Sequence, residues 1–399
     1  MASSRERLML EQVTDPEIIR FTHLQNSEAW RSKYLTAEEY AEREKLLGSS
    51  AISTRNKCLE MQEQFPDTYS WLGLKYFVLK NKSLPETSKM SQIVSSCETL
   101  NRIGWMVGPE SSEIRPVLSV CIGGVFTSKE NRGKGYAGEM ITRLNAFYDD
   151  LGSQPDAPRL LRDKIMFLYS EVGEYYSKFG YISKPVPVHA ISSLEGLVNV
   201  FCAANVVDGD GRSLGFDDYE DLIELEKEQF QKSLVKLQRA HPNSHIFTVE
   251  PSLEIYQWFK HRDIFLASKV NPESLPPTKF GFALPDGSHV IWHHHWPEKA
   301  LYIVKICIND DTINKEGTLK RLLAESVAEA ARSGLDHLEF WDEEIADFEW
   351  SRSLFEYLES SENKENLYKE NGSRSAIRPP EGCSSGGFIW DNNTKFCWF

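Results

Sequence analysis

Runs of apolar residues predict β-strands in the first half of the chain. Three runs are rich in aromatic and β-branched residues, Trp71–Leu79, Val117–Thr127 and Lys164–Tyr169, which is typical of strands. A further strand is expected within Ser91–Met106. The two adjacent glycines inside the Val117–Thr127 run predict a bulge or a close backbone approach by a ligand.

Helical periodicity follows the second of these runs. Apolar residues recur at i, i+3 and i+4 spacing over 135–151 and predict an amphipathic helix that packs on a sheet. A short helix is expected over Gly173–Phe179, ended by Gly180. An earlier helix begins at the capping box of Thr36 and Glu39. Strand, helix and strand in this order imply a right-handed crossover and an α/β architecture.

The second half of the chain repeats the same order of elements. A hairpin, a strand, a helix and a further strand are predicted at Phe280–Leu284 with His289–His293, Ala300–Ile308, Leu319–Ala331 and His337–Trp341. Element order alone supports this repeat, since the sequence has no period. We therefore expect two domains, 1–185 and 186–399, of which the second is a degenerate copy of the first.

Three segments of the second half carry weaker patterns. Residues 183–200 contain two prolines and are expected to form a linker. Residues 341–370 hold ten acidic and three basic residues, which favours a solvated face or a mobile insertion. Residues 371–387 are rich in Gly, Ser and Pro and are expected to loop out. The terminal aromatic residues Trp398 and Phe399 are expected to pack against the protein.

Composition narrows the class of protein. The chain has 399 residues, 41% hydrophobic and 26% charged, so it can bury a sizeable core in two or three domains. A net charge of −14 argues against a non-specific nucleic-acid binder. Seven scattered cysteines without CxxC spacing fit reduced thiols and a cytoplasmic location. The sequence contains no apolar run long enough to span a membrane, and no membrane partner is expected.

The strongest chemical signal lies where the Val117–Thr127 strand leads into the helix. The connecting loop contains Arg132, Gly133, Lys134 and Gly135. Glycines let a backbone approach an anion closely, and the first N–H groups of a helix have no internal partner. The loop is not a Walker motif, and its match to GxGxxG alone is weak. We expect it to hold a pyrophosphate.

This loop resembles a motif of the GNAT superfamily of N-acetyltransferases. Arg132 to Ala137 (RGKGYA) is similar to the Arg/Gln-x-x-Gly-x-Gly/Ala signature, and Tyr175 to Tyr181 is similar to the next motif of that family, with Tyr181 in place of the usual Phe. The resemblance covers about residues 60–185 and implies a mixed sheet flanked by helices. It also implies that acetyl-CoA is the co-substrate and that Tyr176 protonates the departing thiolate.

The cofactor-binding residues that this resemblance implies belong to the strand end, the loop and the first turn of the helix. They are Val125, Phe126, Thr127, Arg132, Gly133, Lys134, Gly135, Tyr136 and Ala137.

A closer resemblance points to the fungal L-lysine N6-acetyltransferases of lysine catabolism. It rests on Leu35 to Glu44, on Tyr169 to Gly173 and on the long second half. It implies that the acceptor is a small-molecule amine, most directly free L-lysine. Two alternatives stay open: another amine, such as a polyamine or a protein N-terminus, and a non-catalytic acetyl-CoA-binding regulatory protein.

Acyl transfer to an amine needs a base, an oxyanion donor and an acid. The lysine ammonium has a pKa of about 10.4 and must lose a proton. Glu171 ends the Lys164–Tyr169 strand region and is the expected base, although it is equally suited to be a charge partner at a helix N-terminus. The N–H of Phe126 or a neighbour is the expected oxyanion donor.

Other candidate residues favour structural roles. The His293-His294-His295 run is not expected to bind metal, because alternate strand residues face opposite sides. Cys121 is expected to be a core thiol. In the second half, Asp310 and Asp311 stand where the first half has its basic loop. Carboxylates repel a pyrophosphate, so one acetyl-CoA is expected per chain.

Overall fold

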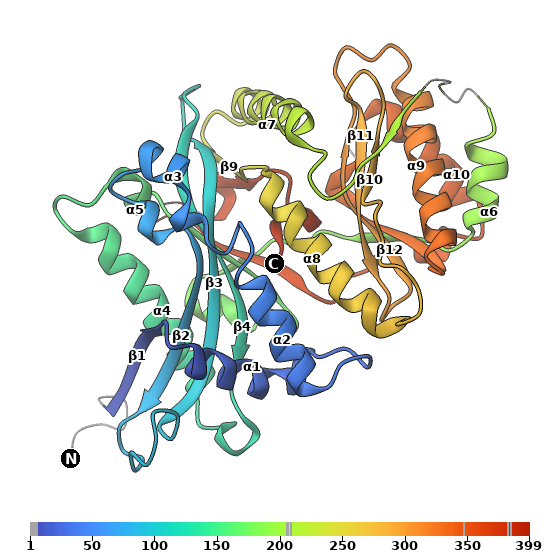
Figure 1. Cartoon of the computed structure of the whole chain (residues 1–399). Helices are drawn as coiled ribbons and strands as arrows, with labels where there is room; N and C mark the ends of the chain where they lie inside the picture. The colour runs from blue at the N-terminus through green and yellow to red at the C-terminus, as the bar shows by residue number, and fades with distance from the viewer. Residues whose placement is uncertain (1–6, 205–206, 208–209, 346–347, 381–382, 384) are drawn as a thin grey trace.

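The computed structural model describes residues 7–204, 207, 210–345, 348–380, 383 and 385–399. These residues form two β-sheets with helices around them (Figure 1). The larger sheet has the order β1 (Leu8–Val13), β2 (Gly73–Asn81), β3 (Ile93–Val107), β4 (Arg115–Phe126), β5 (Ile165–Ser170), β14 (Arg374–Arg378) and β6 (Ile182–Ser183). At one end of β3, β9 (His245–Val249) pairs with it, and β15 (Phe388–Trp390) pairs with β9.

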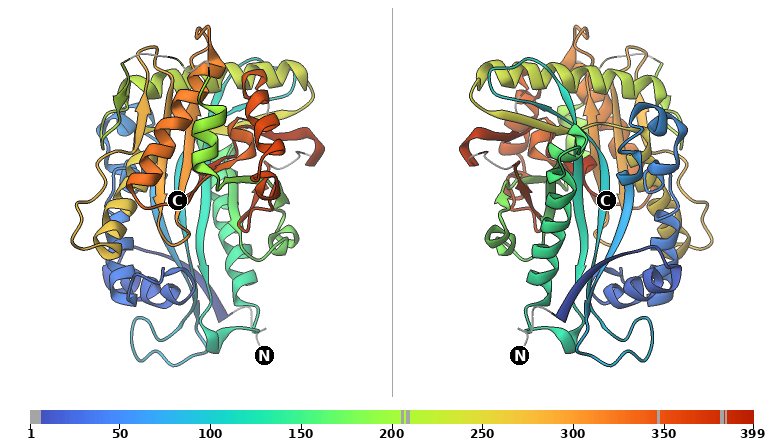
Figure 2. Two further views of the ribbon diagram at one scale, coloured as in Figure 1. Left: turned by 90° about the vertical axis from the view of Figure 1, so that its right-hand side faces the viewer. Right: turned by 90° about the vertical axis from the view of Figure 1, so that its left-hand side faces the viewer.

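The smaller sheet belongs to the second half of the chain. Its order is β7 (Val188–Ile191), β13 (His337–Trp341), β12 (Ala300–Cys307), β11 (His289–His295), β10 (Gly281–Ala283) and β8 (Arg212–Ser213). Figure 1 shows the two sheets side by side with the C-terminus between them, and in the turned views of Figure 2 the two sheets lie one in front of the other.

Helices pack on both sheets. Those of the first half are α1 (Pro16–Trp30), α2 (Ala37–Leu47), α3 (Leu59–Gln64), α4 (Tyr136–Ser153) and α5 (Arg159–Arg162). Those of the second half are α6 (Leu194–Gly196), α7 (Glu220–Ala240), α8 (Leu253–Val270), α9 (Lys315–Arg332) and α10 (Arg352–Ser360). Helix α8 contacts both α2 and β11, so it joins the two halves.

The predicted core of the first half is confirmed. Thr36 caps α2 with a complete capping box, and α4 buries Met140, Ile141, Leu144 and Tyr148 against the sheet. Strands β4 and β5 are parallel, with α4 as the crossover between them. Burying such an apolar stripe stabilises the helix far more than its intrinsic propensity does.

The repeated element order is confirmed as well. Strands β11 and β12 are antiparallel, β12 and β13 are parallel, and α9 forms the crossover, as α4 does in the first half. The division into 1–185 and 186–399 stays a prediction. Strands β9, β14 and β15 come from the second half and pair in the sheet of the first half.

Two sequence expectations about loops are wrong, and one of the two alternatives for a third segment is confirmed. The 371–387 segment contains β14, which pairs with β5 and buries Ala376 and Ile377. The acidic 341–370 segment contains α10, which buries Leu354 and Leu358 and exposes Glu356 and Glu359, so its described part forms the expected solvated face rather than a mobile insertion. The 183–200 segment contributes β7 to the smaller sheet. In each case a few apolar residues find a partner far away in the sequence, which local composition does not reveal.

Helix α8 was not expected from the pattern. Its buried face includes the charged residues Lys260 and Asp263 beside Trp258, Phe259 and Leu266, and this mixture hides the helical period. Among the described residues, no helix has the length and apolar character needed to cross a membrane.

Candidate active site

A cavity of about 710 Å³ opens between the two sheets. Its lining comes from the ends of β4 and β5, from α1, α2 and α8, from β11 to β13, and from the last residues of the chain. The half of the chain that forms the smaller sheet thus closes one side of the cavity. Because the walls come from distant segments, the cavity exists only in the folded chain.

A bulge in β4 opens the larger sheet into this cavity. Ser96 of β3 is opposite Phe126, and Glu98 is opposite Gly123, so β4 carries one extra residue between these pairs. Gly124 has φ +59°, a left-handed conformation that favours glycine. The predicted bulge at the glycine pair is confirmed. The close approach at Gly123 is made by Phe399, whose Cζ would lie 2.7 Å from an added Cβ.

The basic loop lies where β4 leads into α4. Gly133 and Gly135 have φ +77° and +82°, and an added Cβ at either would meet open space. Gly135 is the N-cap of α4, an 18-residue helix, so the first N–H groups of this helix are available to an anion. Arg132 donates from Nε to the Thr127 carbonyl at 3.0 Å. The exposed Arg132 guanidinium also lies 3.4 Å from Glu28.

Two further loop residues support this geometry. Lys134 Nζ donates to Asn131 at 3.3 Å, and the Tyr136 hydroxyl accepts from Asn81 at 3.0 Å. The loop is thus a basic turn with open space beside its glycines. It fits a pyrophosphate, and the cofactor roles of its residues stay predictions.

Tyr176 and Glu171 line the same cavity as the bulge. Tyr176 is partly buried, with Tyr175 and Tyr181 rings at 5.3 and 6.2 Å, and burial raises its hydroxyl pKa well above the usual value. It therefore carries a proton at neutral pH. Glu171 is exposed and accepts a hydrogen bond from the Trp30 indole at 3.2 Å. The structure brings both residues to the cavity, and their catalytic roles stay predictions.

Glu98 is a cavity carboxylate that the sequence analysis missed. It lies on β3 opposite the bulge, and its Cδ would be 3.8 Å from a Cβ added at Gly124. Its Oε1 lies 2.7 Å from Nε2 of the buried His23. The available signal was Glu98 as the lone carboxylate of the Ser91–Met106 run, whose one other charged residue is Arg102. A carboxylate in a strand core usually needs such a partner.

The His23–Glu98 pair predicts a pH dependence of stability. Burial alone would lower the pKa of His23, but the Glu98 carboxylate outweighs burial and raises that pKa above 6.5. The free energy that the pair contributes is therefore fully present below pH 6.5 and is lost as the pH rises through the folded pKa. Urea unfolding of the wild type and His23→Gln should show a stability gap that narrows from pH 6 to pH 9. A gap that widens with pH would contradict this assignment.

The last aromatic residues pack into the cavity, as expected. Trp398 stacks on Tyr169 of β5 at 4.2 Å between ring centroids, and Trp398 and Phe399 both line the cavity. The preceding Phe396 and Cys397 are fully buried. Burial of one large aromatic side chain is worth roughly 1.5–3 kcal/mol, so this segment is held in place.

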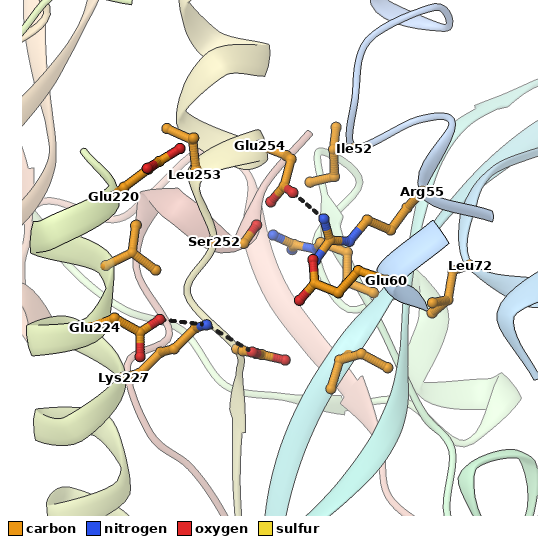
Figure 3. A pocket seen from close by; sticks show the side chains of 14 residues that line it. Ile52, Arg55, Glu60, Leu72, Glu220, Glu224, Lys227, Ser252, Leu253 and Glu254 are labelled. Carbon is orange, nitrogen blue, oxygen red and sulfur yellow. Dashed lines mark hydrogen bonds and ion pairs between the residues drawn. The ribbon is translucent and has the colours of Figure 1, made fainter. Parts of the chain in front are cut away.

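A second, smaller cavity is lined by residues of α3, β3, α7 and the start of α8 (Figure 3). It has about 250 Å³ and contains the ion pair of Arg55 with Glu254 and that of Lys227 with Glu224 at 3.0 Å. Its Arg102 donates to the carbonyl of Phe396 at 3.2 Å. Arg102 thus anchors the terminal segment, while Arg55 and Lys227 are paired with carboxylates of the cavity wall.

The remaining chemical candidates make contacts within the protein. His293 and His294 both contact Asp263, and the described residues hold no group of His, Cys, Asp and Glu suited to a metal ion. Cys121 is buried, which raises its thiol pKa and keeps it protonated. In the second half, Asp310 pairs with Lys232 at 3.2 Å. The prediction of a single acetyl-CoA per chain is not tested by this geometry.

Comparisons with known proteins agree with this architecture. Residues 204–399 match the family model of the LYC1 GNAT-like C-terminal domain. An uncharacterised protein of Saccharomyces cerevisiae is 49% identical over 100% of this chain and 99% of its own length. A lysine acetyltransferase of Yarrowia lipolytica is 24% identical over 75% of each chain.

One solved structure shows the same fold. The GCN5-related N-acetyltransferase from Anabaena variabilis has a TM-score of 0.52 and 12% sequence identity, and the match covers 94% of this chain and 74% of that chain. The chain belongs to the GNAT superfamily of N-acetyltransferases, close to the lysine acetyltransferases.

Proposed function

We propose that this protein transfers the acetyl group of acetyl-CoA to the primary amine of a small molecule, most directly the N6 amine of free L-lysine. The observation that carries the proposal is the continuity of the site. A basic loop at the start of α4 leads into a bulge of β4, and the bulge opens into a cavity lined by carboxylates and aromatic rings. The similarity to the Yarrowia lysine acetyltransferase supports lysine as the acceptor.

The loop residues would hold the co-substrate. Arg132 and Lys134 supply positive charge, and the backbone from Gly133 to Ala137 supplies N–H groups to the pyrophosphate. The backbone of Val125, Phe126 and Thr127 would align the acyl arm along the open end of β4. Acetyl-CoA supplies an activated thioester carbonyl.

The residues around the bulge would carry the proton transfers. Glu98, held by His23, or the exposed Glu171 takes a proton from the acceptor ammonium, directly or through water. The amine nitrogen then bonds to the acetyl carbon while the carbon–sulfur bond breaks. Tyr176 would give its proton to the thiolate, and the second proton that the acetylated nitrogen loses would restore the neutral tyrosine through water. Gly124 and Val125 have no partner across β3, so an N–H from this segment or from Phe126 can stabilise the oxyanion.

A screen of amines tests the reaction. The purified protein is incubated with acetyl-CoA and with single amines, and released CoA is measured. L-Lysine should give the highest kcat/KM, and mass spectrometry should place the acetyl group on N6. Preference for a polyamine or a peptide N-terminus would overturn the lysine assignment. Acetyl-CoA binding without turnover on any amine would instead favour a regulatory acetyl-CoA-binding protein.

The Gly135→Asp variant tests the loop. Aspartate adds a negative charge at the N-cap of α4 and must adopt φ +82° there. Affinity for acetyl-CoA should fall by at least the roughly 1–3 kcal/mol of a lost charged hydrogen bond, or about 5- to 150-fold. Isothermal titration calorimetry with acetyl-CoA measures this change in affinity.

Gly334→Asp is the matched control for this variant. Gly334 also has a positive φ of +65° and open space around its Cβ position, but it follows α9. This variant should bind acetyl-CoA like the wild type. Equal affinity of both variants would remove the assignment of acetyl-CoA to the loop.

A role in lysine degradation and a cytoplasmic location also belong to the proposal.

A further inference from the structure

The cavity wall made by the second half carries an arginine without a carboxylate partner. Arg262 of α8 lines the cavity, and its guanidinium packs over the Trp258 ring at 4.8 Å. Its Nε is buried and has no hydrogen-bond partner. Among the described residues, no carboxylate lies within 4.0 Å of its nitrogens. Burying a guanidinium group without such a partner costs free energy, and a bound ligand that accepts its hydrogen bonds would remove this cost.

Lys395 adds a second cation to this wall. It is 8% exposed and lines the same cavity. Its Nζ lies over the rings of Trp398, Tyr302, Trp341 and Phe259, at 4.0, 5.1, 5.2 and 6.0 Å from their centroids. No ion pair of Lys395 is found within the described part of the chain. Aromatic rings hold an ammonium group but do not neutralise its charge.

The pKa values of the basic groups in this wall reflect their burial and the positive charges near them. Burial and Arg262 lower the pKa of Lys395 to about 7. Burial and Arg43 lower the pKa of Arg262 to about 10, although the carboxylates of Glu44 and Asp263 act in the opposite direction. Burial, His293 and then Lys395 lower the pKa of His295 to about 2, and its Nδ1 lacks a hydrogen-bond partner. An anion bound among these groups would reverse the repulsion.

A negative pair lies beside the cations. Glu298 and Glu339 both line the cavity. Burial and the Glu298 charge raise the pKa of Glu339 to about 7. Glu298 accepts a hydrogen bond from Tyr302 and lies 3.6 Å from His295. A cation placed here would relieve the repulsion between the two carboxylates.

Aromatic rings separate the cations from the bulge. Phe399 touches the backbone at Gly123, its ring centroid is 6.3 Å from that of Trp258, and Trp258 packs on Arg262. The rings of Trp258 and Phe399 thus form an apolar stretch of the cavity wall between Arg262 and the bulge. Such a stretch suits the methylene groups of a substrate and not a second polar group.

We propose that Arg262 and Lys395 bind the α-carboxylate of an amino-acid substrate, with Glu298 and Glu339 facing its α-ammonium. This inference rests on the proposed acetyltransferase function and names the substrate class, an α-amino acid with an aliphatic side chain that ends in an amine. A guanidinium binds a carboxylate through two parallel hydrogen bonds, which fixes the orientation of the ligand. The side chain then follows the rings toward the bulge, where Glu98 can accept the proton.

Substrates with and without the carboxylate charge test this subsite. L-Lysine and L-lysine methyl ester differ in that charge and share the aliphatic amine. For Arg262→Met, we expect KM for lysine to rise roughly 10- to 100-fold, as for a lost charged hydrogen bond, with KM for the ester nearly unchanged. Lys395→Met should show the same selectivity with a smaller change. An equal rise for both substrates would overturn the subsite.

Arg55→Met is the control, because Arg55 lines the second cavity and pairs with Glu254. It should leave the ratio of the two KM values at the wild-type level. Thermal unfolding of each variant monitors folding, and Arg262→Lys, which keeps the charge, should recover part of the lysine preference if Arg262→Met is unstable. No recovery in a folded Arg262→Lys protein would count against the subsite.

The subsite can fail separately from the proposed reaction. If the wild type acetylates no amine, the reaction is wrong, and calorimetric titration with lysine and with its methyl ester then tests the subsite alone. Tighter binding of lysine that disappears in Arg262→Met would support the subsite. Equal binding of the two probes to the wild type would overturn it.

Discussion

Replacing Glu98 with glutamine is expected to lower kcat roughly 10²–10⁴-fold, the usual contribution of a general base. The carboxylate lies opposite the bulge of β4 and is held by His23 at 2.7 Å. Glutamine has the same shape but cannot accept the proton of the acceptor ammonium. Steady-state CoA release at saturating lysine measures the effect, and acetyl-CoA affinity should be unchanged.

Glu171→Gln distinguishes the two candidate bases. Glu171 is exposed and bonded to the Trp30 indole, so water can replace its role more easily than that of a buried carboxylate. We expect a smaller loss of kcat for this variant than for Glu98→Gln. If Glu171→Gln loses more, the base is Glu171, as the sequence analysis predicted, and Glu98 only supports β3.

Tyr176→Phe is the second variant with a large expected effect. It removes one hydroxyl group, and burial keeps the pKa of that group high, so the tyrosine is a proton donor at neutral pH. Loss of a general acid should lower kcat roughly 10²–10⁴-fold, while acetyl-CoA binding holds. Turnover with a thioester of a more acidic thiol should be less affected, because that leaving group needs less protonation.

Tyr175→Phe is the neighbouring control. Tyr175 has its ring 5.3 Å from that of Tyr176 and faces α4, with its hydroxyl 3.4 Å from a Cβ position at Gly138. It should retain most of the wild-type rate. A near wild-type rate for Tyr176→Phe would mean that water or another group protonates the thiolate.

The basic loop before α4 is the part of the site that the sequence predicts most directly. It connects one strand directly to one amphipathic helix, so all of its determinants are local: glycine at positive φ, basic side chains and free helix N–H groups. Tyr176 was predictable for the same reason, since it lies in a short motif that ends at Gly180. Glu98 was not, because its significance depends on His23, 75 residues away in the sequence.

The cavity wall made by the second half could not be predicted from the sequence either. Nothing in the sequence near Arg262 or Lys395 indicates that they line one cavity, since they come from α8 and from the terminal segment. Strand β14 was expected to be a loop for a similar reason. Its strand character depends on pairing with β5, more than 200 residues earlier, and short strands are stabilised by their neighbours rather than by their own composition.

Local interactions along the chain determined the strands and crossover helices of both halves, the bulge at the glycine pair and the basic loop before α4. Helical and strand periods, caps and turn residues act over a few residues, so the sequence alone displays them. Tertiary structure alone decided which charges meet in the cavity, which carboxylate lies opposite the bulge, and how the terminal aromatic residues close the site. Those contacts form only when distant segments pack together, because burial and charge pairing depend on separation in space and not on separation along the chain.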